Sequence, residues 1–225
     1  MFFLFCSLRM TSFKSNAAYQ RRQGGLSENQ AHRIANSTKL IELDALPTLI
    51  HNKQTDRPTI LEIGFGTGDH LIQQAQKKPH ADFIGIDLYL LGMACLLQKA
   101  EKSKLSNLWA LSIDAYVFLT TPPKSLFHTF NKIYILHPDP WPKKRHHKRR
   151  LLNVDSLTGA HQLLKPGGTI EILSDEASYT ESIITDVAEC LPDKHTASSP
   201  ILPKTKYGLK AIQEGRVITK IVITK

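Results

Sequence analysis

The sequence predicts an α/β fold in which a mainly parallel sheet carries helices on both faces. From Pro58 onward, short apolar runs that are typical of buried strands alternate with longer segments of helical periodicity. A glycine-rich turn joins the first apolar run to the helix that follows it. Strands that alternate with helices pair in parallel through right-handed crossovers. The 225 residues, 41% of them hydrophobic, suffice for one domain with a full core.

Residues 1–40 are expected to form a flexible N-terminal arm, and residues 41–225 a single domain. The arm is polar, and its Arg21-Arg22 pair is expected either to contact an RNA backbone or to be solvated. The start of the arm, Met1 to Met10, is largely apolar but too short to span a membrane. It also lacks the basic region and the cleavage site of a signal peptide, so a disordered or weakly packed extension is expected.

Strands and helices are expected in strict alternation after the arm. The apolar runs predict strands at Thr59–Ile63, Asp82–Asp87, Leu108–Ile113, Lys132–Leu136 and Thr169–Leu173. Helices are expected at Ile41–Asn52, Gly68–Lys78, Leu90–Lys102, Ala115–Leu119, Asp155–Leu164 and Tyr179–Cys190, after a short helix that begins near Ser27. Because Pro47 lacks a backbone N–H, it is expected to break or restart the helix that contains it.

The C-terminal part of the chain predicts a strand of a different kind. Residues Arg216–Thr224 alternate apolar and polar side chains, which suits a half-exposed antiparallel strand at the edge of the sheet. The stretch Thr196–Pro203 is expected to be a loop, and Lys165–Gly168 a tight turn.

Charge and cysteine content restrict the partner and the compartment. The formal net charge is +9 and the isoelectric point is about 9.5, which favours an anionic partner. Cys6, Cys95 and Cys190 lie far apart, so neither a disulfide framework nor a structural zinc site is indicated. A reducing cytoplasm therefore fits best.

The first predicted strand runs into a turn with glycine at positions 64, 66 and 68. Glycines at this spacing let the backbone approach a ligand closely. A dinucleotide site would present a helix N-terminus to a pyrophosphate, whereas S-adenosylmethionine has no phosphate and carries a cationic sulfonium and amino group. The carboxylate of Glu62, just before the turn, suits the cationic ligand better. The alternative for Glu62 is a surface acid at a strand end.

Two further acids end the second and third predicted strands. An acid at the position of Asp87 can accept hydrogen bonds from ribose hydroxyls, and Asp114 is placed to bind an adenine amino group. Either aspartate could instead be the N-cap of the following helix. Together with Glu62, these acids favour an adenosine-containing cofactor.

The most highly charged stretch follows the fourth predicted strand. It reads Pro-Asp-Pro-Trp-Pro from Pro138 and continues with eight consecutive Lys, Arg or His residues, ending at Arg150. Six of the eight carry fixed positive charge, and a polyanion would offset their mutual repulsion. Nucleic acid is the obvious polyanion, while a solvated loop or a nuclear-import-like signal is the alternative. The position after a strand end favours a ligand site.

Aromatic and histidine side chains flank this run. Trp141 is expected either to stack on a base or to anchor the proline-rich loop. His137, His146 and His147 have no acid or cysteine at metal-ligand spacing, so phosphate contact or solvation is favoured over a metal site.

Taken together, these motifs resemble the bacterial tRNA (guanine-N7)-methyltransferase family, across about residues 22–223. The resemblance rests on Leu61–Gly68, Ile84–Asp87, Asp114-Ala115, Pro138–Arg150 and Thr205–Tyr207. It implies a Rossmann-like class I methyltransferase fold and S-adenosyl-L-methionine as cofactor. Residues implied to bind the cofactor are Glu62, Gly64, Gly66, Gly68, Asp87, Asp114 and Asp139. Residues implied to bind tRNA are Lys143, Arg145, His146, Lys148, Arg149, Arg150, Asp175, Thr205, Lys206, Tyr207 and Gly208.

The chain departs from the family's pattern at three places. Gly208 stands where the family usually has an acid, and Leu136-His137 replaces paired aromatic residues before the basic loop. Leu91-Gly92 also stands where Pro-Gly is frequent.

Methylation of guanine N7 fits these residue types. N7 has an in-plane lone pair and no proton to lose, so methyl transfer needs positioning more than a general base. The purine becomes cationic as the methyl group arrives, and Asp139 is the expected catalytic carboxylate, supported by Asp175. Alternatively, Asp139 orients guanine by accepting hydrogen bonds from its N1–H and amino group.

The family resemblance further implies guanine 46 of the tRNA variable loop as the target. Other possibilities are a methyltransferase that acts on another RNA, on protein or on a small molecule, and a catalytically impaired RNA-binding paralogue. A cytoplasmic monomer or weak homodimer is expected, with no membrane contact and no obligatory protein partner.

Overall fold

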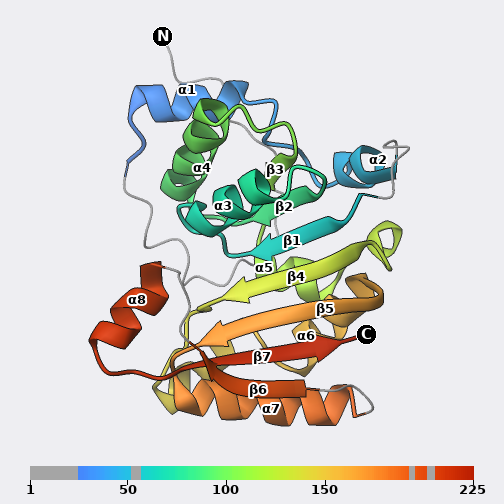
Figure 1. Ribbon diagram of the computed structural model, residues 1–225, viewed down its shortest axis with the longest axis vertical. Helices are drawn as coiled ribbons and strands as arrows, with labels where there is room; N and C mark the ends of the chain where they lie inside the picture. The colour runs from blue at the N-terminus through green and yellow to red at the C-terminus, as the bar shows by residue number, and fades with distance from the viewer. Residues whose placement is uncertain (1–24, 52–56, 193–195, 202–205) are drawn as a thin grey trace.

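The computed structural model describes residues 25–51, 57–192, 196–201 and 206–225, with side chains described outside 196–201 and 206–207. Within these residues the chain forms a seven-stranded sheet in the order β3-β2-β1-β4-β5-β7-β6 (Figure 1). Neighbouring strands from β3 to β5 pair in parallel, whereas β7 is antiparallel to both β5 and β6. The strands span β1 Thr59–Ile63, β2 Asp82–Ile86, β3 Leu108–Leu111, β4 Phe130–Leu136, β5 Leu164–Ser174, β6 Thr196–Ile201 and β7 Ile218–Thr224. The predicted fold class is confirmed.

Helices cover both faces of this sheet. They span α1 Glu28–Asn36, α2 Ala45–His51, α3 Asp69–Lys77, α4 Leu90–Lys102, α5 Ala115–Thr120, α6 Val154–Leu163, α7 Ala177–Cys190 and α8 Lys206–Gln213, with 3-10 turns η2 Lys124–Leu126 and η3 Lys144–Arg149. In Figure 1, α3 and α4 lie on one face and α6 and α7 on the other, with α1 packed on α4. Each layer has its own cluster of buried apolar side chains, as expected where helices cover a parallel sheet on both faces. None of the helices within the described ranges is long and apolar enough to cross a membrane.

Most predicted elements lie where the sequence places them. β1 and α4 coincide with their predicted bounds, and Ser27 caps α1 through a capping box with Gln30. The helix predicted from Ile41 begins instead at Ala45, because residues before it extend the sheet: the Ile41 N–H donates to the Ala110 carbonyl of β3. Pro47 does not break α2. It lies in the first turn, where no intrahelical N–H donor is required.

The C-terminal region differs most from the prediction. The tail forms an antiparallel strand, β7, but it lies between β5 and β6 and is not itself the edge. The edge strand is β6, in a stretch that we expected to be loop; its Pro200 is tolerated because an edge strand leaves one side unpaired. The predicted turn at Lys165–Gly168 lies inside the longer β5, where the register with β4 shifts.

The strand order places the functional edge of the sheet. The chain proceeds from β1 outward to β3 and then returns to the other side of β1 as β4. At such a switch point the segments that follow two neighbouring strands diverge and leave a crevice beyond their carboxyl ends. The segments that diverge here are the glycine turn after β1 and the Pro138–Arg150 loop after β4. Helix α8 lies near this same edge (Figure 1).

Candidate active site

The glycine turn between β1 and α3 has a backbone that other residues rarely adopt. Gly64, Gly66 and Gly68 have φ angles of 74°, 56° and 73°. All three lie in the left-handed region, where glycine alone escapes the steric cost of a Cβ atom. Gly92 of α4 packs so closely that a Cβ atom there would lie 2.1 Å from the Gly66 carbonyl oxygen. This packing fixes the position of the turn.

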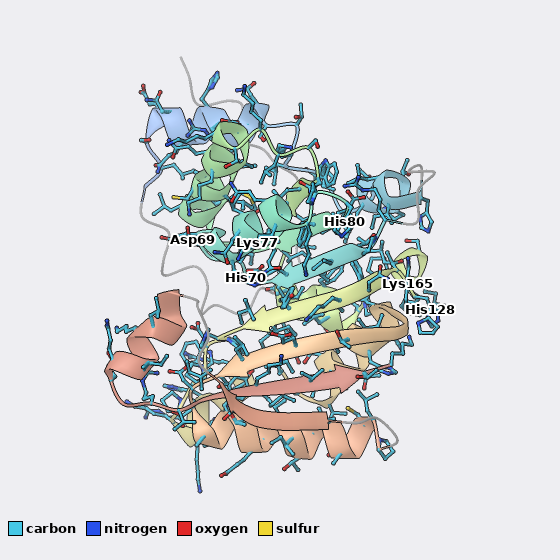
Figure 2. The ribbon with its side chains drawn as sticks, viewed as in Figure 1. Asp69, His70, Lys77, His80, His128 and Lys165 are labelled. Carbon is cyan, nitrogen blue, oxygen red and sulfur yellow. The ribbon has the colours of Figure 1, made fainter. Side chains whose placement is uncertain are left out.

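Glu62 lies in β1 just before this turn and is buried, with 3% of its surface exposed. Its Oε2 is 2.7 Å from Nδ1 of His70, which belongs to the first turn of α3 and also packs edge-on against Tyr134. Figure 2 shows His70 beside Asp69 at the start of α3. Burial raises the pKa of Glu62, and the hydrogen bond and charge of His70 oppose this rise. Glu62 is therefore a buried acid with a hydrogen-bonded partner, which is not the surface acid of the alternative interpretation.

Asp87 follows β2 and ties two segments of the site together. Its Oδ2 accepts a hydrogen bond from the Gly66 N–H at 2.7 Å, and its Oδ1 accepts one from the Tyr89 N–H at 2.9 Å. Burial raises its pKa, backbone donors lower it, and the charge of Asp139 raises it again. Asp87 and Asp139 are thus close enough to interact, although they come from different strands.

Asp114 is the N-cap of α5, so the capping alternative holds for this residue. Its Oδ1 accepts hydrogen bonds from the N–H groups of Tyr116 and Val117, at 2.8 and 3.2 Å. The second carboxylate oxygen, Oδ2, is used by neither bond. Asp114 can therefore cap α5 through Oδ1 and contact a ligand through Oδ2, since each carboxylate oxygen has two lone pairs.

Lys99 supports the glycine turn, and sequence reasoning missed it. Its Nζ donates to the Thr67 carbonyl oxygen at 2.6 Å and to Asp69 Oδ1 at 2.5 Å. Lys99 lies near the C-terminal end of α4, far from the turn in sequence. Nothing in the local pattern around it marks it as part of the site; only the packing of α3 on α4 brings it there.

The loop after β4 carries the candidate catalytic carboxylate. Both neighbours of the Pro138–Pro140 segment, His137 and Trp141, have left-handed backbones with φ of 51° and 43°. Such conformations are strained for residues with a side chain and cluster at functional sites. Asp139, between them, is half-buried. Its effect on the pKa of Asp87 agrees with a position near Asp87, at the carboxyl ends of the parallel strands.

Most of the basic run is available to an anionic partner. Residues 144–149 form the 3-10 turn η3. The exposed cations are Lys143, Lys144, Arg145, Lys148 and Arg149, while His146 and His147 are half-buried. Within the described chain no three His, Cys, Asp or Glu side chains gather at metal-binding distance.

Arg150 does not belong to that exposed surface, and its burial argues against the expectation that it grips RNA. Only 5% of its surface is exposed. Its guanidinium donates to the Pro140 carbonyl oxygen at 2.9 Å and to Ser178 Oγ at 3.2 Å. Its hydrogen-bonding groups therefore point into the protein. Sequence alone could not distinguish this arginine from Arg149 beside it, because a run of basic residues does not show which of its side chains is buried.

Trp141 is held by the loop itself. The Arg149 guanidinium lies 5.0 Å from the centre of its ring, and the His146 ring packs against it edge-on at 5.7 Å. These contacts agree with the loop-anchor interpretation. They leave Trp141 half-buried, so base stacking stays a prediction.

Asp175 follows β5 and joins three strand ends. It pairs with Arg216, which precedes β7, and its Oδ1 lies 3.4 Å from Nδ1 of His137. Arg216 also contacts Glu214. Burial and the charge of Arg216 lower the pKa of His137 from 6.5 to about 4. His137 is therefore neutral at physiological pH.

This pKa shift predicts an acid-sensitive contribution to stability. A histidine whose pKa is depressed on folding stabilises the folded state above pH 6.5, and that stability is lost as pH falls toward about 4. The loss is up to about 3 kcal/mol. His137→Asn removes the titration and tolerates the left-handed backbone. We expect urea unfolding of this variant to vary less with pH over that window; an unchanged pH profile would exclude His137 as its source.

The C-terminal motif is only partly described. Thr205 lies outside the described residues, as do the side chains of Lys206 and Tyr207. Gly208 is buried in the first turn of α8. The proposed contacts of this segment with substrate therefore stay predictions. So does the role of the Arg21-Arg22 pair, which also lies outside the described residues.

Comparison with known proteins identifies relatives across most of the chain. The family model described as "Putative methyltransferase" matches residues 56–221. A tRNA (guanine-N(7)-)-methyltransferase from Alkalilimnicola ehrlichii is 35% identical over 177 residues, covering 75% of this chain and 73% of that protein. An enzyme of the same name from Nitrosococcus oceani is 37% identical over 171 residues, covering 74% and 70%.

Solved structures of similar fold include methyltransferases of ribosomal RNA. A 30S ribosomal A1408 methyltransferase from an uncultured bacterium has a TM-score of 0.56 and 17% identity, covering 84% of this chain and 97% of that one. A 16S rRNA (adenine(1408)-N(1))-methyltransferase variant from Catenulisporales acidiphilia, crystallised with the cosubstrate SAM, has a TM-score of 0.55 and 17% identity, covering 82% and 92%. At this identity the likeness concerns the fold.

Proposed function

The chain belongs to the tRNA (guanine-N(7)-)-methyltransferase family, and on that premise we propose that it transfers a methyl group from S-adenosyl-L-methionine to N7 of guanine in tRNA. One observation carries the proposal most strongly. The buried acids at the glycine turn and Asp139 lie at one edge of the sheet, and the loop of Asp139 continues directly into exposed cations. The Pro138–Arg150 loop would therefore contribute both to the cofactor site, through Asp139, and to the polyanion site, through its exposed cations.

The residues at the glycine turn would hold the cofactor. Glu62 suits the cationic methionine end, since a buried carboxylate strongly favours a positive partner. Asp87 can accept hydrogen bonds from ribose hydroxyls, because the hydrogen bonds from Gly66 and Tyr89 leave some of its carboxylate lone pairs free. Asp114 can accept a hydrogen bond from the adenine amino group through Oδ2. Gly64, Gly66 and Gly68 let the backbone approach the nucleoside. The methyl group comes from the cofactor, and these residues orient it.

Asp139 would act on the base. The half-buried carboxylate stabilises the positive charge that develops on guanine as N7 is methylated, because a fixed anion in a poorly solvated site needs no reorganisation. The exposed cations Lys143, Arg145, Lys148 and Arg149, with His146, would hold tRNA phosphates. Asp175 is held by Arg216 and His137, so a contact with substrate must compete with or extend this cluster.

The buried acids predict a pH-dependent affinity for S-adenosylmethionine. Because burial raises the pKa values of Glu62 and Asp87, protons compete with a cationic ligand at higher pH than they would at ordinary carboxyl groups. In the free protein a raised pKa contributes stability at low pH that is lost as pH rises through it, and a bound cation offsets that loss. We expect the cofactor to raise the melting temperature more at neutral pH than at pH ~5.

The matched control for this titration is Glu62→Gln, which keeps the shape and cannot ionise. It should bind the cofactor weakly and with a flatter pH dependence. Equal pH dependence in the parent and in Glu62→Gln, measured by calorimetry, would exclude Glu62 from the cofactor site.

We further propose guanine 46 of the variable loop as the target and a domain of residues 41–225 preceded by an arm. Two unmodified transcripts, identical except that one carries adenine in place of guanine 46, test the position. Methyl transfer to the first and not to the second supports it, whereas equal transfer to both would place the target elsewhere. Ribosomal RNA in place of tRNA tests the alternative substrate.

A further inference from the structure

Arg150 is a buried cation within an otherwise exposed basic run, and its surroundings explain why. Its guanidinium carbon lies 4.6 Å from the centre of the Tyr179 ring. Tyr179 of α7 is fully buried, and its hydroxyl accepts a hydrogen bond from the Leu152 N–H at 2.9 Å. Burial raises the pKa of Asp186, further along α7, and the charge of Arg150 opposes this rise. The cation is thus accommodated by a π face, hydrogen-bond acceptors and a nearby acid.

The hydrogen bond from buried Arg150 to Pro140 holds the loop that contains Asp139. Arg150 Nε donates to the carbonyl oxygen of Pro140, the residue directly after Asp139. Its NH2 group reaches Ser178 at the start of α7, whose Oγ donates to Glu176. One planar guanidinium therefore connects both ends of the Asp139 loop to α7. A guanidinium presents several donors in a rigid fork, so it fixes direction as well as distance.

We propose that Arg150 is a positioning residue: it acts through the Pro140 carbonyl to hold Asp139 and Trp141 where the basic loop meets the cofactor edge. The catalytic part of this inference rests on the proposed function. Arg150 holds the loop that presents the phosphate-binding cations and contributes little to phosphate binding itself. The run of eight basic and histidine residues then divides into an exposed surface and one internal brace.

Two variants that each remove an arginine side chain distinguish support of the loop from phosphate binding. Arg150→Met and Arg145→Met each delete one guanidinium from the same loop, one buried and one exposed. The chain has two tryptophans, so Trp109→Phe leaves Trp141 as the sole tryptophan, whose emission is excited selectively over that of tyrosine. Acrylamide quenching of Trp141 then reports loop order without tRNA or cofactor. The salt dependence of tRNA binding and single-turnover methyl transfer are measured on the same proteins.

We expect opposite patterns from the two variants. Arg150→Met should raise the quenching constant of Trp141 at least about twofold, because the released loop exposes the ring. It should leave the slope of log Kd against log salt unchanged and lower the methyl-transfer rate about 100-fold, since a small displacement of a catalytic group is costly. Arg145→Met should leave quenching unchanged and flatten the salt slope by about one. Arg150→Lys keeps the charge without the fork and should restore only part of the rate.

Two results would overturn the proposal: parental Trp141 quenching in Arg150→Met, or a salt slope flattened as much as in Arg145→Met. If Arg150→Met does not fold, Ser178→Ala removes one anchor of the guanidinium from an exposed position, and increased Trp141 quenching is again required. If the parent protein transfers no methyl group to tRNA, the proposed function fails, while quenching still decides whether Arg150 braces the loop.

Discussion

Asp139→Asn removes methyl transfer while the protein still binds S-adenosylmethionine. The substitution keeps the size of the side chain and deletes the charge that stabilises the cationic methylated guanine. Loss of one preorganised electrostatic group typically costs about 100- to 1,000-fold in rate. Affinity for the cofactor should change much less, because Glu62 still holds the methionine end and Asp87 the ribose. Single-turnover methyl transfer and calorimetry on the same sample measure the two effects.

Asp87 provides an internal check on that variant. The charge of Asp139 contributes to the raised pKa of Asp87, so its removal should bring the pKa of Asp87 down. The matched control is Asp155→Asn, which neutralises an exposed aspartate at the start of α6. It should leave the transfer rate within about twofold, as expected for a surface position. A parental rate in Asp139→Asn would remove Asp139 from the catalytic role.

Asp87→Ala abolishes tight cofactor binding and weakens the fold at the same edge of the sheet. The carboxylate accepts hydrogen bonds from the N–H groups of Gly66 and Tyr89, and the variant leaves both donors without that acceptor. Loss of charged hydrogen bonds in a buried place costs about 2 to 4 kcal/mol in unfolding free energy. Gly66 loses its hydrogen bond to the segment after β2, while Gly64 keeps its own bond to the Ile86 carbonyl oxygen. The ribose loses its acceptor. Affinity for S-adenosylmethionine should fall more than about 100-fold.

Urea unfolding and calorimetry measure both effects for Asp87→Ala. Asp87→Asn retains one acceptor oxygen, so it should recover stability more than affinity. Glu101→Ala removes an exposed acid of α4 that pairs with Arg33, and a surface pair of this kind is worth about 1 kcal/mol or less. Parental cofactor affinity in Asp87→Ala would show that the ligand does not meet this carboxylate.

The sequence predicted the parallel core of the fold well, because buried parallel strands are short apolar runs that differ clearly from helical segments. β1 and α4 coincide with the prediction. The C-terminal elements were harder. β6 contains Pro200 and several small polar residues, and it is a strand only because β7 lies beside it. Pairing between distant segments is a tertiary effect that local patterns do not contain.

In the candidate site too, some residues could be predicted from local sequence and others depend on tertiary packing. Glu62, Asp87 and Asp114 could be predicted to lie at one edge of the sheet, because the carboxyl ends of parallel strands meet there. The partners that hold the site, among them Lys99 and Arg216, come from elements whose packing against the site has no local signature. Arg150 shows the limit most clearly: burial turns the last cation of a basic run from a phosphate ligand into a support for the loop.

The identity of the methylated nucleoside distinguishes guanine N7 in tRNA from every other methyl acceptor. Purified protein is incubated with unmodified tRNA and S-adenosylmethionine that carries an isotopically labelled methyl group. The tRNA is then digested to nucleosides, which are identified by mass spectrometry. The site described here predicts labelled 7-methylguanosine as the product. Label in a different nucleoside, or no labelled nucleoside from folded protein that binds the cofactor, would contradict the assignment of guanine N7 in tRNA as the methyl acceptor.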